Sequence, residues 1–123
     1  MEQRPISAHP LDNGLRLEIL DESRQIAADR WVVRIRFKVA VPVADHYTAV
    51  PPDGIPPLPE LIEQLGSITT FDVVKERNFI SIDEKDAVAE GIVTTFLNDV
   101  APYLGRSSFP GKFILKTYRE KRT

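Results

Sequence analysis

The chain has 123 residues, a formal net charge of -2 at pH 7, and no cysteine. Its length and ordinary apolar fraction predict one α+β domain over residues 1–123 that buries a core without cross-links. The absence of cysteine excludes disulfides, thiolate zinc sites, iron–sulfur clusters and cysteine nucleophiles. Two histidines, His9 and His46, are too few for a multi-histidine metal site, and we expect no metal or cofactor. The nearly balanced charge makes a dedicated nucleic-acid binder unlikely as a class.

The N-terminal region gives no targeting signal. Residues 1–15 contain two prolines and two acidic residues and lack the apolar run of a signal peptide. No stretch approaches the roughly 20 apolar residues that a membrane helix needs. We therefore expect no membrane partner and a cytoplasmic location.

The first third of the chain is predicted to begin with an irregular arm over residues 1–11. Turn residues follow at 12–14, since asparagine and glycine tolerate positive φ. Leu15, Leu17 and Ile19 then alternate with charged residues, which is typical of a strand with one buried face. The polar segment 21–29 is compatible with either a loop or one helical turn.

The clearest pattern in the sequence lies at residues 30–43. Apolar and positively charged side chains alternate there over about a dozen residues rich in β-branched and aromatic types, which predicts a long strand with one buried face. The residues of the apolar face are Trp31, Val33, Ile35, Phe37, Val39 and Val41. The opposite face carries Arg30, Arg34, Arg36 and Lys38.

A proline-rich loop is expected over residues 42–59, because proline provides no N–H and restricts the residue before it. Its length suggests a functional, disordered or surface-wrapped segment. A short helix should follow, with Pro59 at its start and Gly66 at its end. Its apolar stripe consists of Leu58, Leu61, Ile62 and Leu65.

The second half is predicted to contain a β-hairpin, with strands at 69–74 and 79–82 around a turn at 75–78. Apolar residues at three- and four-residue spacing then indicate a helix over 86–101, which Pro102 should end or kink. Segment 110–120 fits either a strand or a helix, and its charged composition favours a helix. The fold is therefore predicted as an antiparallel sheet of about four strands, with the main helix packed across Trp31, Ile35 and Phe37.

The positively charged face of the long strand offers the first candidate binding site. Arg34, Arg36 and Lys38 form a stripe that could bind an anion or a nucleic-acid backbone. The alternative is a solvated sheet face whose charges are neutralised by neighbouring strands. The carboxylates available for this are Glu18, Asp72 and Glu76.

Three further groups are weaker candidates. Arg24 could clamp a ligand or fix its own loop together with Asp29. A P-x-x-P pattern at Pro56, Pro57, Leu58 and Pro59 could dock into an aromatic groove or wrap on its own domain. His46 and Tyr47, which follow Asp45, could serve an interaction or the active site of a small enzyme.

These observations favour a small non-catalytic binding or protein-interaction module, with an unknown protein partner or a second copy of the chain. The grounds are the missing catalytic motif, the proline-rich loop and a strand long enough to leave part of a sheet edge unpaired. Anion or nucleic-acid binding is the alternative, and an enzyme built on residues 45–47 is the second alternative.

Overall fold

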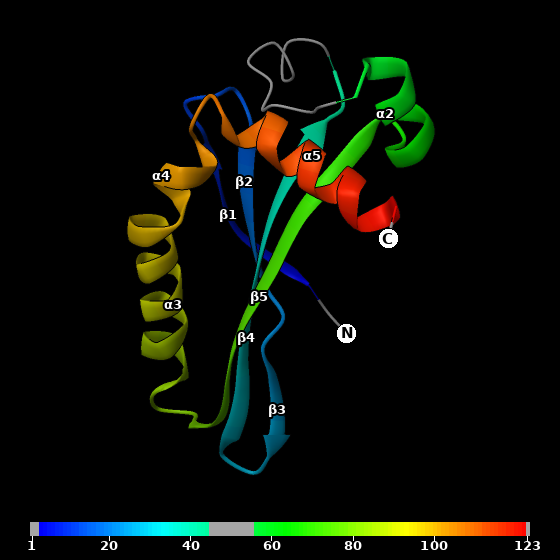
Figure 1. Ribbon diagram of the computed structural model, residues 1–123. Coiled ribbons are helices and arrows are strands. Elements are labelled where there is room, and N and C mark those ends of the chain that lie inside the picture. Colours follow the sequence, from blue (N-terminus) through cyan, green and yellow to red (C-terminus); the bar gives the residue numbers. More distant parts are fainter. Residues whose placement is uncertain (1–2, 45–55, 123) are drawn as a thin grey trace.

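The computed structural model describes residues 3–44 and 56–122, which form a five-stranded antiparallel sheet and helices (Figure 1). The α+β class is confirmed, with five strands where about four were expected. The strands are β1 (Arg4–Pro10), β2 (Arg16–Asp21), β3 (Arg24–Ala27), β4 (Arg30–Pro42) and β5 (Ile68–Ser81). The helices are α2 (Leu58–Leu65), α3 (Lys85–Asp99), α4 (Ala101–Leu104) and α5 (Phe109–Arg122).

The long strand predicted from the alternation at residues 30–43 is confirmed as β4, and β4 lies at the centre of the sheet. One side of β4 pairs with β2 and, further toward its N-terminal end, with β3. The other side pairs with β5 over almost its whole length, from Arg30 opposite Ser81 to Pro42 opposite Ile68. Strand β1 lies outside β2, so β1 and β5 are the two long edges of the sheet.

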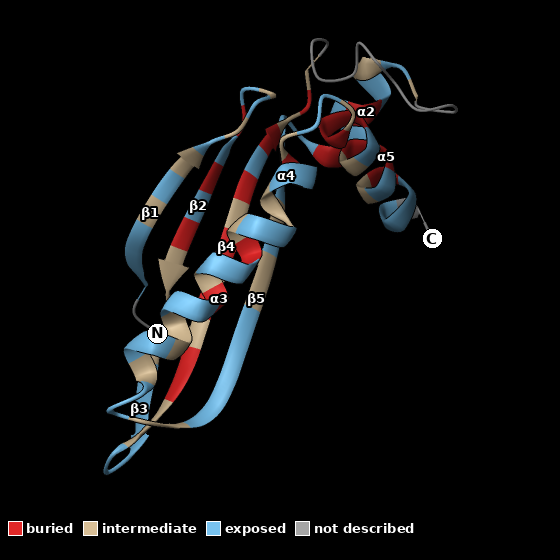
Figure 2. Ribbon diagram, turned by 90° about the vertical axis from the view of Figure 1, so that its left-hand side faces the viewer, coloured by how far each residue is buried: buried red, intermediate tan, exposed pale blue. Residues whose placement is uncertain are grey.

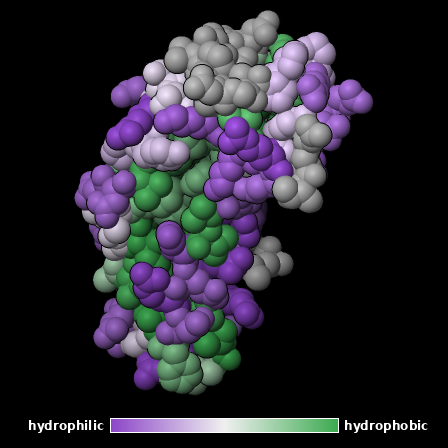
Figure 3. All heavy atoms as spheres, in the orientation of Figure 1, coloured by the Kyte–Doolittle hydropathy of each residue, from purple (hydrophilic) through white to green (hydrophobic). Residues whose placement is uncertain are grey.

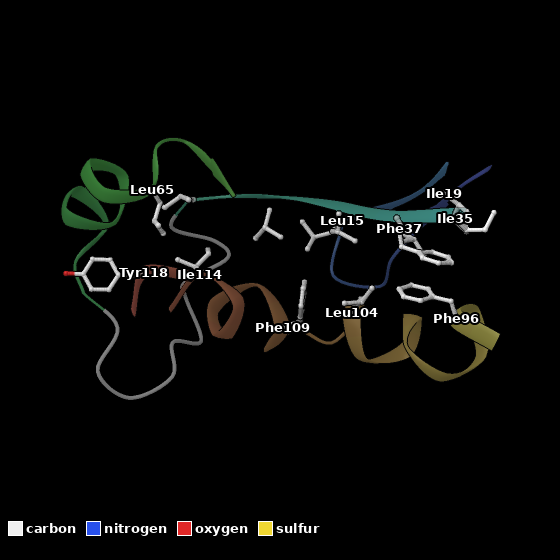
Figure 4. Packing of buried hydrophobic residues seen from close by; sticks show 14 of the residues in the cluster. Leu15, Ile19, Ile35, Phe37, Leu65, Phe96, Leu104, Phe109, Ile114 and Tyr118 are labelled. Atoms are coloured by element: carbon white, nitrogen blue, oxygen red, sulfur yellow. The ribbon is translucent and has the colours of Figure 1, made fainter. Parts of the chain in front are cut away.

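The core lies on one face of the sheet only. Alternate residues of β4 from Val33 to Val41 are completely buried, and α3, α4 and α5 lie on that face (Figure 4). Helix α2 packs against α5 and adds Leu61 and Leu65 to the same core. Phe37 of β4 stacks on Phe96 of α3, with ring centroids 3.7 Å apart. Figure 2 shows that buried residues concentrate along β2 and β4 and on parts of α2 and α5. Trp31, predicted to lie under the main helix, is only half-buried at the margin of this core, where Lys85 lies 4.8 Å from its ring.

The prediction of an irregular arm over residues 1–11 was wrong, because Arg4–Pro10 forms β1. Pro5 and Pro10 concealed the strand in the sequence, yet both lie where an edge strand can do without an N–H donor. Residues 24–27, expected as loop or helix, form β3 on the free upstream part of β4.

The predicted hairpin at 69–82 was also wrong, because Ile68–Ser81 is one continuous strand. A 13-residue β4 offers backbone partners along its full length, so the segment 75–78 stays extended and pairs instead of turning. The expected irregularity survives only as a shift in register beside Trp31. Phe79, at this shift, has φ 61° and is 66% exposed, an uncommon conformation for a bulky residue.

The helices agree more closely with the expectation. Helix α2 has Pro59 in its first turn and ends at Gly66, whose φ of 80° suits glycine. The helix predicted at 86–101 ends at Asp99, and Pro102 lies at the start of the separate short helix α4. The C-terminal segment is the helix α5. The predicted loop 42–59 is shorter at both ends, since Pro42 belongs to β4 and Leu58 to α2, and its residues 45–55 lie outside the described part.

We predict that Phe37→Ala lowers the free energy of unfolding by about 3–5 kcal/mol, because it removes a fully buried ring and its stacking contact with Phe96. Urea denaturation followed by circular dichroism measures the change. Thr94→Ala on the exposed side of α3 is the matched control and should change stability by no more than about 0.5 kcal/mol. Equal effects of the two substitutions would contradict a core centred on Phe37.

Candidate functional site

The predicted cationic stripe lies on the face of the sheet opposite the helices, where Arg34 and Arg36 converge on Glu22. The Nε of Arg34 donates to this carboxylate at 2.9 Å and the Nε of Arg36 at 2.7 Å. Gln3 donates to it as well, and Glu22 is almost completely buried. Glu22 therefore holds the two guanidinium groups in place across β2 and β4.

The hydrogen bond from Arg36, followed by those from Arg34 and Gln3, lowers the pKa of Glu22 to about 2 despite the opposing effect of burial. The same bond to Glu22, with a second to Asp72, raises the pKa of Arg36. Sequence reasoning missed Glu22. The two-residue period of β2, extended beyond its last apolar position, would have placed this side chain on the arginine face.

The neutralisation of this face by neighbouring strands, which was the alternative to anion binding, is observed at two of the three carboxylates. Arg36 contacts Asp72 at 2.6 Å and Arg34 contacts Glu76 at 3.4 Å, both from β5. Lys38 lies in register between Glu18 and Asp72. The nitrogen atoms that an anion would need are thus largely occupied, and anion binding at this stripe stays a prediction.

The other predicted site residues are scattered. Arg24 is exposed on β3, and Asp29 forms its ion pair with Arg30, at 3.5 Å, and not with Arg24. Pro56 and Pro57 precede α2, whereas Leu58 and Pro59 belong to it, so the P-x-x-P pattern is half helical. Asp45, His46 and Tyr47 lie outside the described residues, and the enzyme hypothesis stays a prediction.

The structure draws attention instead to the outer edge of β5. The N–H of Glu22 donates to the backbone oxygen of Arg34, so the even-numbered residues of β4 point their backbone groups toward β2. The N–H of Val43 donates to the backbone oxygen of Ser67, so the odd-numbered residues of β4 point theirs toward β5. In an antiparallel ladder, the odd-numbered residues of β5 then point back at β4. Between Thr69 and Arg77, the groups that point outward belong to Thr70, Asp72, Val74 and Glu76.

The opposite edge, β1, is protected. By the same alternation, Ser7 and His9 point at β2, while Pro5 and Pro10 occupy outward positions without an N–H to offer. Strand β1 is half as long as β5 and has a shift in register between Pro5 and Ser7. Strand β5 has 14 residues, contains no proline, and has no second strand against it in the part of the chain that the structure describes.

A groove runs beside this edge, between β5 and α3, with a volume of about 500 Å³. Figure 3 shows hydrophobic atoms gathered between α3 and β5 and interrupted by hydrophilic ones. Lys75 and Arg77 line the strand side, because they are in register with the core-facing Ile35 and Val33. The residues on the helix side include the apolar Val88, Ile92, Phe96 and Val100.

The groove carries unbalanced positive charge. No carboxylate in the described ranges forms an ion pair with Lys75 or Arg77, although Arg77 donates to the backbone oxygen of Glu76 at 2.9 Å. The only acidic residue lining the groove within those ranges is Asp99. Sequence reasoning assigned Lys75 and Arg77 to a turn, and the shared parity of Val73, Lys75 and Arg77 was the signal that would have placed them on the helix side.

The described residues show neither a metal-binding cluster nor a membrane-spanning helix. Residues 3–44 and 56–122 contain no cluster of three or more histidine, aspartate or glutamate side chains placed to hold a metal ion. None of their helices is both long and apolar enough to cross a membrane.

No protein family, no curated protein and no solved structure matches this chain. Its function is therefore argued from its own geometry.

We predict that Glu22→Gln destabilises the protein at pH 7 by about 3 kcal/mol, which is the order of the linkage for a pKa lowered from 4.5 to about 2. Because folding lowers this pKa, the ionised carboxylate stabilises the folded state fully above about pH 4.5, and the contribution is lost as the pH falls toward 2. Denaturation at a series of pH values should show the variant converging on the wild type in acid. Glu90→Gln, exposed on α3, is the control, and a constant difference at every pH would contradict the role of Glu22.

We predict alternating amide hydrogen exchange along β5 in the free protein. The N–H groups of Val73 and Lys75 point at β4 and should exchange at least about tenfold more slowly than those of Val74 and Glu76, which point outward. Exchange followed by NMR measures this within one strand, so neighbouring residues serve as internal controls. Uniform protection would mean that the edge is already covered, and protection that grows with protein concentration would identify a second copy as the cover.

Proposed function

We propose that the protein is a non-catalytic interaction module that takes an extended segment of a protein partner as an additional strand along β5. The supporting observation is that the 14-residue β5, whose outer edge has no strand against it among residues 3–44 and 56–122, lies beside a groove of about 500 Å³ on its helix side. In such strand addition, main-chain hydrogen bonds supply affinity and pockets for alternate side chains supply specificity.

The difference between the two sheet edges supports this assignment. Natural proteins protect exposed edges with proline and irregular register, and β1 has both. Strand β5 offers outward N–H groups at four alternate residues and is interrupted only near Phe79. A partner segment of about seven residues could pair with the regular stretch between Thr70 and Glu76.

Self-association through this edge is disfavoured by charge. In an antiparallel pair, residues that lie directly opposite each other are on the same face of the sheet. Two copies of β5 paired about residue 76 would bring Lys75 of one chain against Arg77 of the other, and in any antiparallel register each copy adds the same two cations to the shared face. The odd-numbered positions from Phe71 to Phe79 contain no acidic residue to offset this repulsion.

The alternative of anion or nucleic-acid binding has less support. Arg34 and Arg36, which would carry it, already bond to Glu22, Glu76 and Asp72. An incoming phosphate would have to displace the nearly buried Glu22 carboxylate from both guanidinium groups. Displacement would leave a buried charge without its partners, which is costly.

Peptides selected from a random phage-displayed library test the proposal, with Val74→Pro as the diagnostic variant. Proline at 74 removes an outward N–H without removing a bond to β4, so binding of the selected peptides should fall at least about tenfold. Val74→Thr keeps the N–H and should bind as the wild type does.

Isothermal titration calorimetry measures the affinities, and thermal melting verifies that both variants fold. Equal binding by Val74→Pro and the wild type would contradict the proposal. Failure to select any peptide would contradict it as well.

A further inference from the structure

We infer that acidic and apolar residues of the partner segment alternate with small polar ones. Its carboxylates face Lys75 and Arg77, and its apolar side chains face α3. This inference rests on the proposed strand addition at β5 and adds the chemistry of the ligand. The carboxylates and the apolar side chains share one face of the segment, and the small polar residues occupy the other.

The positive charge of the groove is the evidence that the partner segment is acidic. A strand added outside β5 places its alternate side chains directly opposite Val73, Lys75 and Arg77, on the helix side of the sheet. Neither cation has a carboxylate partner among the described residues, so both can pair with an incoming one. Opposite charges on facing positions of neighbouring strands stabilise the pairing, and like charges oppose it.

The apolar wall of the groove is the evidence that the partner segment also has apolar side chains. Val88, Ile92 and Val100 are half-buried or nearly buried along the side of α3 that faces the groove, next to the buried Phe96. An apolar side chain entering from the added strand would remove this surface from water. A volume of about 500 Å³ is sufficient for more than one such side chain.

The opposite face of β5 explains why the charge requirement falls on one side of the ligand only. Asp72 and Glu76 point away from the helices, and their carboxylates already contact Arg36 and Arg34. Residues of the ligand that face this side meet charges that are already balanced. Small polar residues such as threonine fit there.

The test uses two nine-residue synthetic peptides with threonine at every second position. The positions between carry glutamate and leucine in one peptide and lysine and leucine in the other. The wild-type protein should bind the glutamate peptide at least about tenfold more tightly, with a preference that weakens as sodium chloride is raised. The double variant K75E/R77E should reverse the preference, and K75Q/R77Q should abolish it.

The control K112E/R119E makes the same change in net charge on exposed positions of α5 and should keep the wild-type preference. Thermal melting verifies folding, and the neutral variant provides the result if the reversed one does not fold. Equal binding of both peptides, or a preference unaffected at Lys75 and Arg77, would overturn this inference. The proposed strand addition would then still stand if Val74→Pro weakened the binding of library-selected peptides, so the two failures are distinguishable.

Discussion

The structure depends on the two-residue period of β4, which separates a completely apolar face from a charged one. Five alternate side chains from Val33 to Val41 are excluded from water, and the helices gather on that side because the apolar surface is there. The stacked rings of Phe37 and Phe96 join the sheet to α3 at the centre of this contact. Since a shift of one residue would turn every one of these side chains to water, the register of the neighbouring strands is fixed by the same constraint.

Glu22 organises the charged face of the sheet, and its ion pairs give Arg34 and Arg36 a structural role. A carboxylate held at 2.7 Å and 2.9 Å from two guanidinium nitrogens needs its partners, and they in turn are less available to a ligand. On the other side of the sheet, Lys75 and Arg77 form no ion pair with a carboxylate of the described residues. We propose that these two cations, beside an apolar wall and an edge that no other described strand covers, belong to a binding surface.

The sequence patterns correctly predicted the elements whose formation depends mainly on residues close together in the chain. The alternation of β4, the glycine stop of α2 and the helical spacing of α3 all agreed with the structure, with shifts of a few residues. Strand β1 was missed because Pro5 and Pro10 are tolerated only at an outer edge, which a sequence does not reveal. The segment around Asn78 has the composition of a turn, and it stays extended because β5 pairs with the long β4. The groove could not be predicted either, because it forms between a strand and a helix whose relative position depends on tertiary contacts.

The central claim is that β5 accepts a partner strand on its outer edge, and intermolecular NMR contacts test it most directly. In an added antiparallel strand, the residues of β5 that bond to β4 form the non-hydrogen-bonded pairs with the ligand, in which the Cα atoms approach most closely. Bound peptide should therefore show Hα–Hα nuclear Overhauser effects to Val73 and Lys75. A peptide that bound with contacts to other surfaces and none to β5 would contradict the account.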